Sequence, residues 1–364
     1  MRILRVAQKV YPDVKGGGPY HVHAMSRDQA TMGHDVTVLT VRTDPELPHV
    51  EERDGYTVVR YDPAVTLLGN DISPGLAQYL SSAEDFDVMH AHSHLYFATN
   101  LAALKRFLGD IPLAITNHGL YSQNAPEWVF DLYLRTLGRW TFNQADVVFC
   151  YTGTDKQRVR DFGVSSPIEV VSNGIDTERF TPEGPESELV DAEGPVVLFV
   201  GRLVEGKRPW LVVEAFAEVL DEHHGAELYL CGGGPLRDDL EARVRELGIE
   251  SSISFLGQVP YDEMPAVYRS ADALVLPSRS EGVPRTIMEA LSAELSVVSS
   301  ELVQVQSAFG DAVTYVPEAE AFGGQLVDVL NDGRKRSGLN EQFCWARTVE
   351  ETTTVVARVV NDSM

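Results

Sequence analysis

The stretch SRSEGVPRTIMEALSAE, residues 278–294, holds two carboxylates eight residues apart, Glu281 and Glu289. Glu281 falls in a Gly/Pro turn, and Glu289 falls in an apolar pattern with helical spacing, where a buried strand ends and a helix begins. Each carboxylate oxygen can accept a hydrogen bond, so a carboxylate suits a pair of vicinal hydroxyl groups. The same residue types form the acid and base of glycoside hydrolysis, and two solvated glutamates are the plainest alternative.

Cations at one predicted strand end and backbone amides at a predicted helix start indicate an anion site. In FVGRLVEGKRP, Arg202 lies just beyond a buried strand and Lys207 lies in the turn before a helix. Two cations at one strand end can converge on a phosphate, although surface ion pairing is the alternative. Pro284 suits the first turn of a helix running to about residue 293, so the amides near 283–286 should point toward an anion.

Two glycine runs were tested as phosphate loops. The first, residues 16–18, follows the first strand and precedes a helix, so its backbone could approach an anion closely. A dinucleotide fingerprint needs glycine three residues after Gly18, and His21 stands there. The second run, residues 232–234, fails in the same way because Arg237 replaces glycine. A flexible loop without a ligand is the alternative for both.

Short β-branched apolar runs alternate with amphipathic stretches, which is typical of parallel strands joined by helices. The pattern predicts two Rossmann-like domains with parallel sheets facing a central cleft, because open parallel sheets bind ligands at the carboxyl ends of their strands. The expected division is 1–172 (first Rossmann-like domain), 173–193 (Pro/Gly/acid-rich linker), 194–343 (second Rossmann-like domain) and 344–364 (a helix returning to the first domain). Strands are expected at 2–7, 35–41, 56–61, 87–92, 112–116, 146–152 and 167–171, then at 194–201, 226–232, 252–257, 272–278, 296–300 and 312–316.

Composition narrows the class of protein. The chain has 364 residues, a formal charge of −24 and 44% hydrophobic residues, which is typical of a globular protein that repels nucleic acid. It has no long apolar run and no signal-peptide core, so we expect a cytoplasmic protein. Its three cysteines suggest neither a disulfide framework nor a zinc site. Few lysines on an acid-rich chain indicate a halophilic source, with an arginine-rich genome as the alternative.

Several separated motifs, in order, resemble one family: KGGGPYHVHAMSRDQATMGHDVTVLT, DVMHAHS, TNHG, VVSNGIDTERFTP, FVGRLVEGKRP, LYLCGGGP, ISFLGQVP, YRSADALVLPSRSEGVPRTIMEAL and FCWARTVEE. The chain is similar to the retaining, nucleotide-sugar-dependent glycosyltransferases of GT-B architecture, family 4 or "glycosyl transferases group 1". The resemblance spans nearly the whole chain. It implies transfer of a hexosyl unit from a UDP- or GDP-sugar, used as a co-substrate, with no permanently bound cofactor and no metal.

The resemblance also implies roles for particular residues. Arg202 and Lys207 would form a phosphate clamp in place of a metal ion, Glu281 would contact the donor hexose, and Glu289 would bind the ribose hydroxyls. His118, at the end of a predicted strand in ITNHG, would lie beside the donor sugar, with an ordinary core histidine as the alternative. The other expected donor-binding residues are Gly16, Gly17, Gly18, Gly257, Val259, Gly282, Val283, Pro284, Arg285 and Thr286.

The chain departs from the family pattern after Glu289. Glu294 stands where a helix-ending glycine is expected, which would put a glutamate into a left-handed cap at a cost of roughly 1 kcal/mol. Val303 and Gln304 replace a glycine pair whose backbone normally lies near the donor. The donor is therefore held differently at this edge, or the chain is a weak or inactive nucleotide-sugar-binding partner subunit. A sugar-nucleotide epimerase of the same architecture is a more distant alternative.

The acceptor is the part on which the sequence says least. Residues 126–144 combine five aromatic side chains with Arg135 and Arg139, and few acids. Such a segment could contact the cytoplasmic face of a membrane and receive a lipid-linked acceptor for surface polysaccharide or glycoprotein glycan assembly. A helix that packs into the core and exposes two arginines is the alternative.

Overall fold

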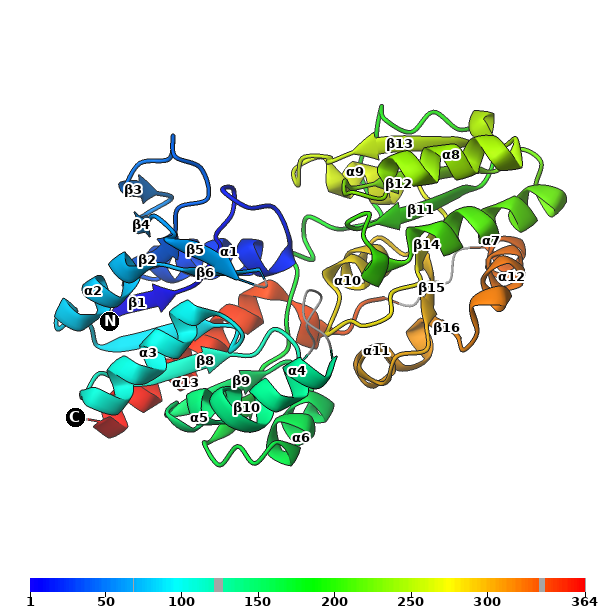
Figure 1. Ribbon diagram of the computed structural model, residues 1–364. Coiled ribbons are helices and arrows are strands. Elements are labelled where there is room, and N and C mark those ends of the chain that lie inside the picture. Colours follow the sequence, from blue (N-terminus) through cyan, green and yellow to red (C-terminus); the bar gives the residue numbers. More distant parts are fainter. Residues whose placement is uncertain (68, 121–126, 334–337, 364) are drawn as a thin grey trace. The chain divides into compact units, whose positions relative to one another are not determined.

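The computed structural model describes residues 1–67, 69–120, 127–333 and 338–363, and it divides into two compact units. The first unit holds residues 1–172 and 347–364, and the second holds residues 173–346. Each unit is an open sheet with helices packed against it (Figure 1). The α/β class with two Rossmann-like domains built on parallel sheets is confirmed.

The first unit is built on an eight-stranded sheet with the order β10-β9-β8-β7-β1-β2-β4-β3. All neighbouring strands pair in parallel except β3 with β4. The strands are β1 (Arg2–Val6), β2 (Asp35–Val41), β3 (Val50–Arg53), β4 (Tyr56–Tyr61), β7 (Val88–His92), β8 (Leu113–Thr116), β9 (Val147–Cys150) and β10 (Ile168–Val170). A separate antiparallel pair is formed by β5 (Val65–Leu67) and β6 (Asn70–Ile72).

Helices cover both faces of this sheet. On one face, Val22 of the first helix and Val355, Val356 and Val360 of the last helix pack on Ile3 and its neighbours. The other face is covered by the helices that follow β6, β7, β8 and β9. The helices are α1 (Gly17–Thr31), α2 (Pro74–Ser82), α3 (Phe97–Leu108), α4 (Glu127–Tyr133), a π-helical turn (Leu134–Gly138), α5 (Arg139–Asn143), α6 (Gly153–Asp161) and α13 (Trp345–Ser363).

The second unit has a six-stranded parallel sheet with the order β13-β12-β11-β14-β15-β16. Its strands are β11 (Val196–Val200), β12 (Glu227–Cys231), β13 (Ile253–Gly257), β14 (Ala273–Leu276), β15 (Ser296–Ser300) and β16 (Thr314–Val316). Its helices are α7 (Pro209–Glu222), α8 (Arg237–Leu247), α9 (Met264–Arg269), α10 (Arg285–Ser292), α11 (Val303–Phe309) and α12 (Phe322–Asp332). Figure 1 shows α7 and α12 next to each other, where they bury one face of the sheet.

The predicted strands are found at their expected places, whereas three short strands were missed. β3 is the polar sequence VEER, and it pairs only with β4 at the edge of the sheet. An edge strand needs no apolar alternation, since much of it faces water. β5 and β6 each have three residues, too few to show a period.

The segment from Asn173 to Glu193 has little regular structure and packs against the second unit. Ile175 forms a parallel bridge with Cys344, and the Ile175 amide donates to Phe343 O at 2.9 Å. Arg269 Nε donates to Pro185 O at 2.7 Å. In the first unit, α13 is fastened by Thr348 Oγ1, which donates to Ser172 O at 2.8 Å.

Glu294 has φ of +60°, which confirms the left-handed conformation expected from the missing glycine. The end of α10 is a Schellman motif, because the Leu295 amide donates to Ala290 O at 2.9 Å and the Glu294 amide donates to Leu291 O at 3.1 Å. A residue with a Cβ is strained in this conformation, whereas glycine is not.

We therefore expect Glu294→Gly to raise the free energy of unfolding by about 1 kcal/mol relative to Glu294→Ala. Both variants remove the glutamate side chain and its contacts, so their difference isolates the backbone conformation. Urea denaturation followed by circular dichroism measures it. Equal stability of the two variants would contradict the strain argument.

Candidate functional site

The candidate site in the second unit lies at the carboxyl ends of β11 and β14. These strands are neighbours, and the strand order reverses between them, since β12 and β13 continue on one side and β15 and β16 on the other. Loops that leave such a point diverge to opposite faces of the sheet and open a crevice where open α/β sheets bind ligands. Arg202 and Lys207 follow β11, and Glu281 follows β14. The fold thus brings together residues more than 70 positions apart.

Lys207 and Glu281 form an ion pair across this switch point. Lys207 Nζ donates to Glu281 Oε1, and the two side chains are only 17% and 7% exposed. A buried carboxylate without this cation would carry an uncompensated charge, so each group holds the other in place. Arg202 is exposed on the same loop as Lys207. The predicted phosphate clamp and the predicted sugar-binding carboxylate therefore share one site.

Arg208 fastens the two loops, and sequence reasoning missed it. Its Nε donates to Pro277 O at 2.5 Å, and its Nη2 donates to Ser300 Oγ at 2.8 Å. The Arg279 amide closes the same connection by donating to Gly206 O at 2.9 Å. Burial, and next the charge of Arg279, lower the pKa of Arg208. Arg208 itself has φ of +48°, a strained conformation of the kind that concentrates at functional loops.

Glu289 lies on α10 and is buried in a network of phenols. Tyr268 OH donates to its Oε2 at 2.8 Å, and Tyr261 OH donates to its Oε1 at 3.2 Å. Arg285 Nη2 in turn donates to Tyr261 OH at 2.8 Å, which leaves the Tyr261 proton for Glu289. Burial raises the pKa of Glu289, although Arg285 opposes the shift. Each Glu289 oxygen thus accepts a hydrogen bond from a phenol, and Arg285 Nε lies 3.7 Å from Oε1.

The loop from Gly282 to Pro284 is buried against the start of α10. Pro284 was expected in the first turn, but it is the N-cap residue and Arg285 begins the helix. Arg285 and Thr286 are half-buried. The helix ends at Ser292, with Ala293 as its C-cap, close to the predicted end.

Glycines at the ends of β12 and β13 allow the strand-end loops to pack directly on one another. Gly232 has φ of +140°, and a Cβ on it would lie 1.8 Å from Gly201 O. A Cβ on Gly234 would lie 2.3 Å from Leu203 O. The second glycine run is therefore a packing contact that supports the Arg202 loop. Gly257 accepts a hydrogen bond from the Gly232 amide at 2.7 Å, and Val259 follows on the way to Tyr261.

The glycine pair expected near the donor is replaced by the first residues of α11. Val303 and Gln304 lie in the first turn of this helix, and Val303 is 63% exposed. Side chains therefore project where the family pattern has bare backbone. At this edge, the structure has helical residues with side chains in place of the glycine backbone of the family pattern.

In the first unit, His118 follows β8, is half-buried, and lies against a cluster of buried histidines. His92 Nδ1 and His118 Nε2 are 3.0 Å apart, and His118 Nδ1 is 2.7 Å from Tyr151 OH. The His21 ring packs edge-on against His118 at 5.1 Å. Burial lowers the pKa of His118 to about 4 and that of His94 to about 3. His118 is thus a neutral ring at ordinary pH.

Glycines 16–18 lead into α1, and Gly16 has φ of +142°. A charge network that sequence reasoning missed anchors the loop just before them. Asp13 accepts from Arg60 Nε at 2.7 Å and from Arg53 Nη2 at 2.8 Å. Burial by itself raises the pKa of Asp13, but these hydrogen bonds bring it below its usual value. The pairs fix the base of the glycine loop to β3 and β4.

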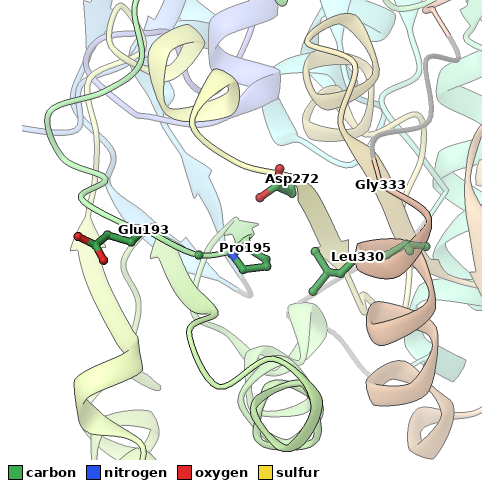
Figure 2. A pocket seen from close by; sticks show the side chains of 7 residues that line it. Glu193, Pro195, Asp272, Leu330 and Gly333 are labelled. Carbon is green, nitrogen blue, oxygen red and sulfur yellow. The ribbon is translucent and has the colours of Figure 1, made fainter.

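A cavity of about 300 Å³ lies at the opposite edge of the second sheet, near the amino ends of β11 and β14 (Figure 2). Pro195 and Asp272 line it, and each directly precedes one of these strands. Asp272 Oδ2 accepts a hydrogen bond from the Val196 amide at 2.9 Å. None of the predicted site residues lines the cavity. Within the described residues, no cluster of three histidine, cysteine or acidic residues could hold a metal ion.

The segment 126–144 is both core and surface, and its first residue lies outside the described residues. Phe130, Leu134 and Phe142 are buried, as the alternative of a core-packing helix expects. Trp128 is 72% exposed and Leu132 is 56% exposed, one turn apart on α4. No helix in the described part of the chain is long and apolar enough to cross a membrane.

Comparison with known proteins agrees with this architecture. Residues 15–179 match the family model "Glycosyltransferase Family 4", and residues 181–342 match "Glycosyl transferases group 1". A D-inositol 3-phosphate glycosyltransferase of Corynebacterium aurimucosum is 28% identical over 94% of this chain and 91% of its own. A glycogen synthase of Mycobacterium tuberculosis is 29% identical over 83% and 78%.

Solved structures share the fold. Sucrose-phosphate synthase from Thermosynechococcus elongatus superposes with a TM-score of 0.82 at 18% identity, covering 100% of both chains. Anabaena HepE in complex with UDP and glucose gives a TM-score of 0.76 at 16% identity, over 98% of this chain and 100% of that chain. The fold and the strand-end site define a GT-B glycosyltransferase that uses a nucleotide-sugar donor. The chain belongs to glycosyltransferase family 4.

The buried histidines make stability depend on pH. Burial lowers the pKa of His90, His92, His94 and His118 in the folded state below the ordinary value of 6.5. Unfolded histidines take up protons as the pH falls through that value, whereas the folded ones do not. The stability they contribute is therefore present above about pH 6.5 and is lost as the pH falls toward 4.

We expect the first unit to lose about 2 kcal/mol per fully buried histidine between about pH 7.5 and pH 5. Thermal unfolding recorded across this range measures the loss. His94→Leu should reduce this loss by about 2 kcal/mol, whereas His224→Gln, which changes an exposed histidine of the second unit, should leave it intact. A melting temperature of the unchanged protein that does not vary with pH over this range would contradict the proposed role of the histidines.

Proposed function

We propose that the chain is a retaining transferase that moves a hexosyl unit from a nucleoside diphosphate to a hydroxyl of a glycan or lipid-linked acceptor. The Lys207–Glu281 pair at the switch point of the second sheet carries this proposal. In it, a cation suited to a diphosphate and a carboxylate suited to a sugar hydroxyl lie in contact. The first unit takes the acceptor, and the second unit binds the nucleotide sugar. Retention of the anomeric configuration is inferred from membership of glycosyltransferase family 4.

The reaction breaks the bond between the anomeric carbon and the diphosphate oxygen. Negative charge develops on the diphosphate, and Lys207 and Arg202 neutralise it as it forms. Glu281 exchanges its contact with Lys207 for a hydroxyl of the hexose. Glu289 accepts from the ribose. The acceptor hydroxyl attacks on the face from which the diphosphate leaves and passes its proton to the departing diphosphate oxygen, so no protein nucleophile is required.

Uridine is the favoured base and glucose the favoured sugar. Support comes from the related structures of Anabaena HepE, which hold UDP with glucose or UDP-glucose. Those structures are 16% identical to this chain, and the identity of its donor is proposed by analogy with them. Its base and sugar can be read directly from binding.

A thermal-shift panel of UDP-, GDP- and ADP-sugars tests the donor site. A ligand at about 100 times its dissociation constant stabilises the folded protein by about 2.7 kcal/mol. We expect a clear shift with a UDP-sugar, unchanged by EDTA. Lys207→Ala should abolish it, whereas Arg245→Ala, which removes an exposed arginine from α8, should not. A shift that needs a divalent ion, or that survives Lys207→Ala, would remove the clamp assignment.

The altered edge at Val303 and Gln304 favours the second candidate, a nucleotide-sugar-binding subunit with little or no activity. Side chains at this edge occupy the place of backbone that approaches the donor in the family pattern. The rate at which free nucleoside diphosphate is released from the bound donor distinguishes an active transferase from a binding subunit. Lys207→Ala and Glu289→Ala should each lower this rate about 100-fold if the chain is an enzyme. A panel that shows binding without any turnover would favour the subunit.

The first unit is proposed to touch an anionic membrane through α4. Trp128 and Leu132 are exposed on this helix, and Arg135, which pairs with Asp131 at 2.8 Å, follows on the π-helical turn. On α3, Phe107 is 62% exposed and lies 6.2 Å from the Trp140 ring. Aromatic side chains together with basic residues suit the boundary between headgroups and acyl chains.

Flotation with vesicles that contain acidic phospholipids tests this contact. Trp128→Ser with Leu132→Ser should reduce the floated fraction at least about tenfold, because buried apolar area supplies most of the binding. Val65→Ser removes a residue of the same unit that is 53% exposed and serves as the control. The membrane contact is wrong if the double variant and the control float equally well.

A further inference from the structure

A fully buried arginine lies at the centre of the first sheet, and the proposed reaction does not use it. Arg5 on β1 is 0% exposed. Within the described residues it forms no ion pair with a carboxylate. Its Nε has no hydrogen-bond partner in the described part of the chain. Burial lowers the pKa of Arg5 to about 9. Such a group is expensive to bury, so its contacts require an explanation.

The contacts of Arg5 are with neutral side chains. Nη1 lies 2.9 Å from His92 Nε2 and 3.4 Å from His90 Nδ1, and Nη2 donates to Gln29 Oε1. Gln29 is held in turn, because its Nε2 donates to Thr353 Oγ1 on α13 at 2.9 Å. The guanidinium is thus fixed between β7 and α1.

The direction of the hydrogen bonds follows from the chemistry of arginine. A guanidinium can only donate, so His92 Nε2 must accept and must lack a proton. A neutral His92 then carries its proton on Nδ1, which points at His118 Nε2 over 3.0 Å. His118 Nε2 accepts in its turn, so the proton of a neutral His118 is on Nδ1 and is donated to Tyr151 OH at 2.7 Å.

His90 obeys the same rule. Its Nδ1 faces Arg5, and its Nε2 lies 2.8 Å from Thr116 Oγ1, so Nε2 carries the proton. The His90 and His92 rings are stacked 4.6 Å apart, and the His92 and His118 rings 5.3 Å apart, which excludes free rotation of any one ring. A single cation therefore sets the protonation pattern of the whole stack.

We propose that Arg5 is a positioning residue that sets the direction of a hydrogen-bond chain through His92 and thereby holds the His118 ring neutral, with its proton on Nδ1. Both ring nitrogens of His118 are then used inside the protein. The ring offers the sugar neither a donor from Nε2 nor a positive charge, and its main chain is left to make the contact. An imidazolium beside a sugar that is gaining positive charge would oppose the reaction.

The value of this arrangement for catalysis rests on the proposed function, but the chain of hydrogen bonds does not. Histidine tautomers are read from long-range ¹H–¹⁵N correlation spectra of the ¹⁵N-histidine-labelled protein without substrate, with His118 assigned by loss of its signals in His118→Gln. In the unchanged protein we expect a protonated Nδ1 and an unprotonated Nε2 for both His92 and His118. A proton on Nε2 of either ring overturns the proposal without any further variant.

Arg5→Met removes the obligatory donor while keeping most of the volume. We expect His92 and His118 to become mixtures of both tautomers, and kcat to fall about tenfold more than the apparent affinity for the donor. Arg5→Lys, which also can only donate, should restore the single tautomer at least in part. Tyr151→Phe is the matched control, because it removes the other partner of His118 and should leave the proton on Nδ1.

The outcomes separate the two proposals. A single unchanged tautomer in Arg5→Met, or a mixture in Tyr151→Phe alone, would show that Arg5 does not set the direction. A changed tautomer with unchanged turnover in Arg5→Met would support the hydrogen-bond chain. It would show that the His118 tautomer plays no part in the proposed reaction.

Discussion

The site depends on the adjacency of β11 and β14 at the point where strand order reverses. That adjacency places Lys207 against Glu281, and each charge offsets the other where both side chains are largely buried. The free protein thus holds its site in a neutral state, with the cation and the carboxylate satisfying each other. A ligand that carries both a diphosphate and a sugar hydroxyl can replace both contacts together. In the proposed function, a ligand with only one of these groups would leave the other charge without a partner, so the pair would favour the complete nucleotide sugar.

Buried and half-buried arginines tie the loops of both units in place. Arg60 joins Asp13 and Glu51 beneath the glycine loop, and Arg208 joins the loops after β11, β14 and β15. Arg285 Nη1 donates to Gly174 O at 2.7 Å and fastens the start of α10. A guanidinium suits these positions because its planar fork reaches several acceptors at once, including main-chain carbonyls. The use of arginine in place of lysine at these positions therefore has a structural reason. A high-salt habitat stays a prediction.

The sequence was most informative where local pattern decides the structure. Apolar β-branched runs such as 196–200 predicted the strands, and the missing glycine at Glu294 predicted a left-handed residue. Contacts between distant segments could not be predicted in this way. Nothing near Glu289 in the sequence indicates that Tyr268 and Tyr261 donate to it, and nothing in RILRV indicates that Arg5 would face two histidines of β7. Such contacts depend on strand order, which periodicity does not specify.

The contrast between lysine and arginine separates a contact that the proposed reaction changes from contacts that it leaves unchanged. Lys207 is a flexible point charge, and in the proposed reaction its bond to Glu281 is broken when a donor binds. Arg5 and Arg208 make several bonds each, in directions fixed by a planar group, and no step of the proposed reaction disturbs them. An arginine in place of Lys207 would hold Glu281 by two bonds and favour the free protein over the complex. A lysine in place of Arg208 could not span Pro277 O and Ser300 Oγ together, so the loops that carry Lys207 and Glu281 would lose their fixed spacing.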